Sequence, residues 1–151
     1  MNTPLSPLDV MKAAPVIPVI VIRDVKDAVP MARALVAGGI RMLEVTLRTP
    51  AGLGAITAIA QQVPEAVVGA GTLRSREDVE LATRAGARFG VSPGYTRAVG
   101  QACRDRGLPL LPGVATSAEI MTAMDDGYDE MKFFPAMQAG GPAMLKAWQG
   151  P

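Results

Sequence analysis

Short runs of apolar residues alternate with amphipathic segments along the chain. The runs are rich in Val, Ile and Leu and show little polar alternation, which is typical of strands buried on both faces of a parallel sheet. The segments between them have the spacing of helices with one apolar face. The predicted strands are 16–22, 42–47, 66–70, 88–92, 108–112 and 130–134, and the predicted helices are 6–14, 26–37, 50–62, 75–85, 96–106, 117–126 and one that begins near Pro142.

Polar caps and glycines mark the ends of these helices. Ser6, with Pro7 after it, is a predicted N-cap, and so are Ser75 and Ser117. Glycines follow the last residues of four predicted helices, at 38–39, 86, 107 and 127. The chain therefore repeats a unit of about 20–26 residues, a helix, a glycine, a strand and a polar loop, which predicts an α/β fold with a parallel sheet.

Polar residues near the strand ends decide between a barrel and an open sheet. Glu44, Arg48, Thr72, Ser92 and Lys132 lie within or just after different predicted strands. A TIM barrel collects reactive groups from the C-terminal ends of several strands, whereas an open doubly wound sheet concentrates its site at one switch point. The distribution favours the barrel.

The number of repeats is smaller than a complete barrel requires. Six strands are predicted, and a (β/α)₈ barrel has eight. We therefore expect residues 1–151 to form a single, partial TIM-barrel domain with about six of the eight βα units. We expect a C-terminal truncation, whether natural or not, that leaves the first and sixth strands as edges.

Composition excludes several classes of function. The net charge is +1, with 15 basic and 14 acidic residues and 4% aromatics, so neither nucleic acid nor an anionic membrane is an expected partner. There is no histidine, which removes Ser-His-Asp and Cys-His catalysis and metal sites that contain histidine; no metal is expected. The single cysteine, Cys103, and the absence of a signal-peptide pattern favour the cytoplasm.

Lys132 is the first candidate for catalysis. It lies between Met131 and Phe133 in a strand that we expect to be buried on both faces. Burial favours the neutral amine over the ammonium ion, and a neutral amine attacks a ketone to form an imine. The alternative is a lysine that extends to solvent or pairs with a carboxylate.

Glu44, Arg48 and Thr72 are the remaining candidates from spacing alone. Inside a barrel Glu44 would face Lys132, either as a proton donor and acceptor or as the partner in a purely structural ion pair. The planar fork of Arg48 suits a carboxylate, although from this residue alone a surface arginine is the commoner outcome. Thr72 follows Gly69-Ala70-Gly71, where the backbone can approach a ligand; the third glycine of the dinucleotide motif is missing, so no cofactor is expected.

Together these residues resemble one known family. The chain is similar to the 2-keto-3-deoxy-6-phosphogluconate (KDPG) aldolases, a class I family that also contains the 4-hydroxy-2-oxoglutarate (KHG) aldolases. The segments that carry the resemblance occur in family order across nearly the whole chain: PVIPVI at 15–20, EVTLRT at 44–49, VGAGT at 68–72, SPG at 92–94, PGVAT at 112–116 and KFFPA at 132–136.

The resemblance implies a TIM-barrel aldolase, usually a homotrimer, that needs no metal. Lys132 matches the Schiff-base lysine, and Glu44 matches the general acid and base, which works partly through a water. Arg48 and Thr72 match residues that hold the pyruvate carboxylate and its surroundings, and Pro93 and Phe134 match residues that line the pyruvate pocket. The implied reaction cleaves KDPG to pyruvate and glyceraldehyde 3-phosphate, as in the Entner–Doudoroff pathway, and KHG to pyruvate and glyoxylate.

Two other functions compete with this one. The family's phosphate-binding glycine loops follow strands seven and eight, which are not among the six strands predicted here. A catalytically weak, aldolase-derived oligomeric module is therefore the alternative. A phosphate-handling barrel similar to thiamin-phosphate synthase is the third hypothesis, and it leaves the joint placement of Glu44, Arg48 and Lys132 unexplained.

Overall fold

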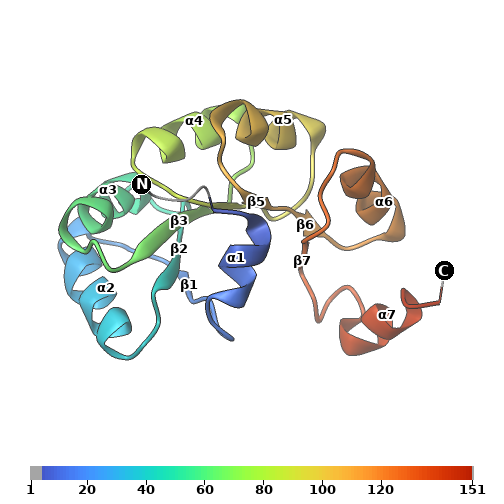
Figure 1. The fold of residues 1–151 in the computed structure, drawn as a ribbon, viewed down its shortest axis with the longest axis horizontal. Coiled ribbons are helices and arrows are strands. Elements are labelled where there is room, and N and C mark those ends of the chain that lie inside the picture. Colours follow the sequence, from blue (N-terminus) through green and yellow to red (C-terminus); the bar gives the residue numbers. More distant parts are fainter. Residues whose placement is uncertain (1–4, 151) are drawn as a thin grey trace.

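The computed structural model describes residues 5–150, which contain two parallel sheets (Figure 1). Strands of the first sheet lie side by side in the order in which they occur in the sequence, and the second sheet is a parallel pair. The first sheet consists of β1 (Val19–Ile20), β2 (Met42–Thr46), β3 (Val67–Gly71), β4 (Gly90–Val91) and β5 (Leu110–Leu111), and the second of β6 (Gly113–Val114) and β7 (Lys132–Phe133).

The strand order decides how the chain winds. Each strand of the first sheet pairs with the next one in sequence, without the reversal of direction that defines a doubly wound sheet. Helices form an arc around the strands, from α2 to α6 (Figure 1). This is the winding of a TIM barrel, and it confirms the predicted fold class. Among residues 5–150, β1 pairs with β2 alone and β7 with β6 alone, so the barrel is open between them.

Pro112 divides one predicted strand into two. The sequence predicts a strand over 108–112, and the structure has β5 before Pro112 and β6 after it. Proline has no N–H to donate to a neighbouring strand, which interrupts the ladder. Its carbonyl oxygen still accepts a hydrogen bond of 2.8 Å from the backbone N of Lys132, so the turn from one sheet to the other holds β7 in register.

The helices begin and end within a few residues of the predicted positions. A short 3₁₀ turn, Val25–Asp27, precedes the second helix. The α-helices are α1 (Pro7–Lys12), α2 (Ala28–Ala37), α3 (Gly52–Gln62), α4 (Arg76–Arg84), α5 (Arg97–Arg106), α6 (Ser117–Asp125) and α7 (Gly141–Ala147).

Two of the three predicted N-caps are confirmed and one is wrong. Ser6 forms a capping box with Asp9, and the Ser75 hydroxyl accepts a hydrogen bond from the backbone N of Asp78. Ser117, however, is already the first helical residue of α6. Thr116 caps that helix instead, because its backbone is extended and its hydroxyl accepts from the backbone N of Glu119.

Alternating residues of the strands belong to two separate apolar cores. Leu43, Val45 and Val68 point outward and pack with residues of the surrounding helices. Met42, Phe89, Val91 and Leu111 point inward and pack with Val10 of α1, which lies inside the arc of helices (Figure 1). Because side chains alternate along a strand, Glu44, two residues after Met42, belongs to the inner face.

Helix length and polarity also bear on membranes: none of the helices that the structure describes is both long and apolar enough to cross one.

Candidate active site

Glu44 is a nearly buried carboxyl group on the inner face of β2. It is 4% exposed, and its register partners are Val19 on β1 and Gly69 on β3. The backbone N of Glu44 donates a hydrogen bond of 3.1 Å to the carbonyl oxygen of Pro18. A strand held on both sides in this way gives the carboxyl group a fixed position inside the arc.

Lys132, on β7 of the second sheet, contacts Glu44 on β2 of the first sheet. Its Nζ lies 3.4 Å from Oε1 of Glu44, across 88 residues of sequence, and 5.1 Å from the centre of the Phe134 ring. The two predicted catalytic residues therefore do face each other. The expected burial of Lys132 is wrong, since its side chain is 26% exposed. The reason is that β7 pairs on one side only among the described residues and is only half-buried.

The environment of Glu44 shifts its acidity. Burial raises the pKa of the Glu44 carboxyl above its ordinary value, and the nearby positive charges of Lys132 and Arg48 oppose that shift without cancelling it. A carboxyl group with a raised pKa holds and releases a proton closer to neutral pH than an exposed glutamate does. This property suits a general acid and base.

Arg48 and Thr72 form a second polar pair just beyond the strand ends. Nε of Arg48 donates a hydrogen bond of 3.2 Å to Oγ1 of Thr72. Thr72 has a φ of 66°, and it is the one non-glycine residue with positive φ in the described part of the chain. Threonine rarely adopts this conformation, and strained backbone of this kind is frequent at binding sites. Because this hydrogen bond uses Nε, the terminal nitrogens of Arg48 can still bind another group.

Pro93 lies on the loop after β4, close to the second sheet. Its carbonyl packs so tightly against Gly113 that a Cβ there would overlap it, and Gly113 is the register partner of Lys132. The structure thus brings the Pro93 loop to the strand pair that carries the lysine. Pro93 also lines a pocket with Arg74, Tyr95 and other residues of the loops that follow β3 and β4.

A larger apolar groove lies on the other side of β7. Its volume is about 390 Å³, and Phe133, Met124, Leu145 and Trp148 are among the residues that line it. The Phe133 and Trp148 rings meet edge to face with centroids 5.0 Å apart. Since Phe133 and Lys132 are adjacent on a strand, their side chains point to opposite faces. The groove is therefore separate from the space around Lys132.

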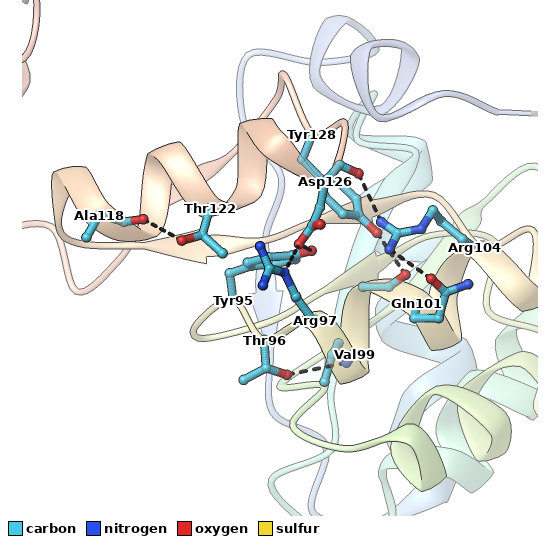
Figure 2. A network of polar contacts seen from close by, with 11 residues as sticks. Tyr95, Thr96, Arg97, Val99, Gln101, Arg104, Ala118, Thr122, Asp126 and Tyr128 are labelled. Atoms are coloured by element: carbon cyan, nitrogen blue, oxygen red, sulfur yellow. Dashed lines mark hydrogen bonds and ion pairs between the residues drawn. The ribbon is translucent and has the colours of Figure 1, made fainter.

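A network of polar side chains joins α5 to the end of α6 on the outside of the sheet (Figure 2). Asp126 accepts hydrogen bonds from the Tyr95 hydroxyl at 2.8 Å and from Nε of Arg97 at 3.0 Å. Arg104 donates to the carbonyl oxygen of Asp126 at 3.1 Å and lies over the ring of Tyr128. No sequence motif marks these residues, because the partners lie 22 to 31 positions apart along the chain.

Fold and site together define a class of protein. A parallel βα barrel that brings an amine and a carboxyl group from two of its strands within 3.4 Å of each other, with an arginine just beyond a strand end, is an enzyme scaffold suited to covalent catalysis through an amine. The arrangement needs no histidine.

The comparisons with known proteins identify the family. Residues 8–151 match the model of the KDPG and KHG aldolase family. The KHG/KDPG aldolase of Escherichia coli strain K12 is 49% identical over 150 residues, which are 99% of this chain and 70% of that protein. The chain belongs to the KDPG and KHG aldolase family, and it is an enzyme of the lyase class.

Solved structures agree with this assignment. A KDPG aldolase from Legionella pneumophila, with pyruvate captured at low pH as a covalent carbinolamine intermediate, matches with a TM-score of 0.94 and 47% identity over 97% of this chain and 71% of that one. A Zymomonas mobilis KDPG aldolase solved with 3-phosphoglycerate matches with a TM-score of 0.88 and 50% identity over 92% of this chain and 66% of that one.

Proposed function

We propose that this protein is a class I aldolase that cleaves KDPG to pyruvate and glyceraldehyde 3-phosphate, with Lys132 as the Schiff-base residue. The observation that carries the proposal is the 3.4 Å contact between Nζ of Lys132 and the nearly buried Glu44 carboxyl, inside a barrel of this family. The carbinolamine in the Legionella pneumophila relative supports the same chemistry.

The reaction begins at the ketone of the substrate. Lys132 first passes a proton to Glu44, and its neutral Nζ then attacks the C2 carbonyl carbon to give a carbinolamine. Glu44 returns the proton to the carbinolamine hydroxyl, which leaves as water, and an iminium ion forms. Glu44, as the carboxylate, accepts the proton of the C4 hydroxyl, partly through a water. The C3–C4 bond then breaks, the aldehyde leaves, and the electron pair moves into the iminium to give an enamine.

The second half of the reaction restores the enzyme. Glu44, now protonated, returns a proton to C3 of the enamine, and water hydrolyses the iminium to release pyruvate and free Lys132. One residue thus acts first as base and then as acid. The raised pKa of Glu44 fits this exchange, because burial moves the pKa of the carboxyl group toward the pH range in which a general acid and base works.

The remaining site residues hold the pyruvate part of the substrate. Arg48, fixed through Nε by Thr72, has its terminal nitrogens free to bind the substrate carboxylate in a two-point contact. Phe134, whose ring centre lies 5.1 Å from Nζ of Lys132, and Pro93, on the loop next to Gly113, are the residues that we expect to contact the carbon atoms of the bound pyruvate group.

A coupled assay of pyruvate release tests the proposal. The parent protein should release pyruvate from KDPG, and also from KHG, in the presence of a metal chelator. Lys132→Met should lower turnover by roughly 10³-fold or more, because the nucleophile is lost. A well-folded parent that releases no pyruvate from either substrate would reject the proposal and favour an oligomeric module without catalysis.

We also propose that the protein acts as a homotrimer in the cytoplasm. Large apolar side chains are exposed on its surface, among them Val16, Met121 and Met137, and subunit contacts commonly bury such residues. The single cysteine is buried and unpaired, as suits a reducing compartment. Light scattering of the purified protein should give three times the mass of one chain, and the mass of a monomer would contradict the trimer.

A further inference from the structure

Gly71, the last residue of β3, lies directly against the Glu44 side chain. A Cβ built at this position would overlap Oε1 of Glu44, and it would stand 2.8 Å from Cγ and 2.9 Å from Cδ. Carbon atoms that are not bonded approach to about 3.5–4.0 Å at their optimum, so these contacts are too short to be accommodated without movement. The space that the carboxyl group occupies exists because residue 71 has no side chain.

The backbone at Gly71 does not itself require glycine. Gly71 is not among the residues with positive φ, and it pairs with Thr46 of β2 as an ordinary member of the parallel ladder. Its carbonyl oxygen accepts a hydrogen bond of 2.9 Å from the backbone N of Leu47. Alanine therefore fits this backbone, and the three atoms nearest to its Cβ would all belong to the Glu44 side chain.

Gly69, two residues earlier on the same face of β3, provides a natural comparison. A Cβ there would overlap the ring of Phe89, a fully buried residue of the inner apolar core. The two glycines thus make room for different neighbours, Gly69 for an apolar ring and Gly71 for a carboxyl group. An alanine at either position would create a steric overlap, but only the alanine at position 71 would overlap Glu44.

We propose that Gly71 is a positioning residue, whose missing side chain holds the Glu44 carboxyl at the point from which it reaches Nζ of Lys132. The inference rests on the proposed function only in treating Glu44 and Lys132 as the reacting pair. With an alanine at 71, the carboxyl group has to leave its place, and the 3.4 Å contact with Nζ is lost.

A stability cycle tests the contact without any activity. Four proteins are compared by urea unfolding: the parent, Gly71→Ala, Glu44→Ala and the double variant. Gly71→Ala should lower the unfolding midpoint in the parent and leave it nearly unchanged once Glu44 is alanine, because the overlapping atoms are then absent. Gly69→Ala is the matched control, and it should lower the midpoint equally in both backgrounds. If Gly71→Ala alone does not fold, the double variant should still fold.

Activity provides the second measurement. Gly71→Ala should lower the turnover number about 100-fold, as expected when a catalytic group is misplaced by about 1 Å, and should alter the pH profile of turnover. Gly69→Ala, corrected for its folded fraction, should keep the parent's pH profile.

The outcomes separate the two proposals. Equal shifts of the unfolding midpoint by Gly71→Ala with and without Glu44 would overturn the inference, as would a Gly71→Ala enzyme with the parent's turnover and pH profile. A parent without aldolase activity would reject the proposed function, and the stability cycle would still decide whether Gly71 positions Glu44.

Discussion

Two carboxyl groups in this molecule, Glu44 inside the barrel and Asp126 on its outer surface, have opposite environments. Asp126 accepts hydrogen bonds from Tyr95 and Arg97, and these bonds, with the Tyr95 hydroxyl as the main cause, lower the pKa of its carboxyl. Glu44 is nearly buried with a longer contact of 3.4 Å to Lys132, and burial raises the pKa of its carboxyl.

The difference indicates what each group does. A carboxylate whose charge is satisfied by several donors stabilises the packing of the elements that supply them, here α5 and the end of α6 (Figure 2). A buried carboxyl group whose negative charge is only partly balanced by nearby positive charges has a raised pKa, and groups with shifted pKa values are frequent in active sites. We therefore expect Asp126 to act in packing and Glu44 in chemistry, so substitutions at the two residues should have separable effects.

The largest expected effect is on turnover when Glu44 loses its acidity. Glu44→Gln keeps the size of the side chain but removes the titrating group, so the turnover number for KDPG should fall by about 10²–10⁴-fold. The assay is pyruvate release under saturating substrate. Asp126→Asn, the matched change in the outer network, should leave turnover of the folded protein unchanged, and equal losses in the two variants would remove the distinction between the two carboxyl groups.

A smaller effect is expected on substrate binding when Arg48 is removed. Arg48→Ala deletes a charge-assisted hydrogen-bond donor to the substrate carboxylate, which is equivalent to about 10- to 100-fold in KM. Arg33→Ala, which removes an exposed arginine from α2, is the control and should leave KM unchanged. If the Arg48→Ala enzyme has the KM of the parent, the substrate carboxylate does not bind to Arg48.

Stability should depend on pH through Glu44 with a defined sign. Because the folded-state pKa of Glu44 is raised, the folded protein binds more protons than the unfolded chain between the unfolded and folded pKa values. The Glu44 contribution is therefore fully present below the unfolded pKa and is lost as pH rises through the folded pKa. Glu44→Gln removes this loss. The unfolding free energy of the variant should therefore increase relative to that of the parent as pH rises, by about 1.4 kcal/mol for each unit of difference between the folded and unfolded pKa values.

Urea unfolding at a series of pH values from acid to neutral measures this gain. Glu65→Gln, which removes an exposed carboxyl group, controls for the loss of a surface charge. A difference between Glu44→Gln and the parent that shrinks as pH rises would show that the pKa shift has the opposite direction.

The smallest expected effect concerns the outer network. Tyr95→Phe removes the 2.8 Å hydrogen bond to Asp126 and should lower the unfolding free energy by about 1 kcal/mol. Turnover and KM should stay at the parent's values, because Tyr95 acts on the packing of α5 against α6. A Tyr95→Phe enzyme with normal stability and reduced turnover would contradict the structural role of this network.

The sequence predicted much of the fold because local signals were strong. The helices were found within a few residues from their amphipathic spacing, caps and glycines, and the strand order followed from the repeat. The first strand was predicted at 16–22 but forms only over Val19–Ile20, because Pro15 and Pro18 have no N–H to donate and Val16 and Val21 are exposed. Thr116 rather than Ser117 caps α6, a difference of one residue that backbone conformation decides.

The candidate site was predicted in part. Residue type and strand position were enough to place Glu44 opposite Lys132, and the structure also joins Arg48 to Thr72. The exposure of Lys132 was not predictable, since it depends on how β7 is paired. Gly71 signalled a close approach in the sequence, but only the three-dimensional arrangement shows that the approaching group is the Glu44 carboxyl. The catalytic and binding roles of these residues remain predictions.

The most direct test of the account is to trap the imine. The protein is incubated with pyruvate and sodium borohydride, digested, and analysed by mass spectrometry, with Lys132→Met as the control. We predict one reduced pyruvyl adduct per chain, located on Lys132 and absent from the variant. An unmodified Lys132 peptide, under conditions that label a known Schiff-base aldolase, or an adduct on another lysine, would contradict the account.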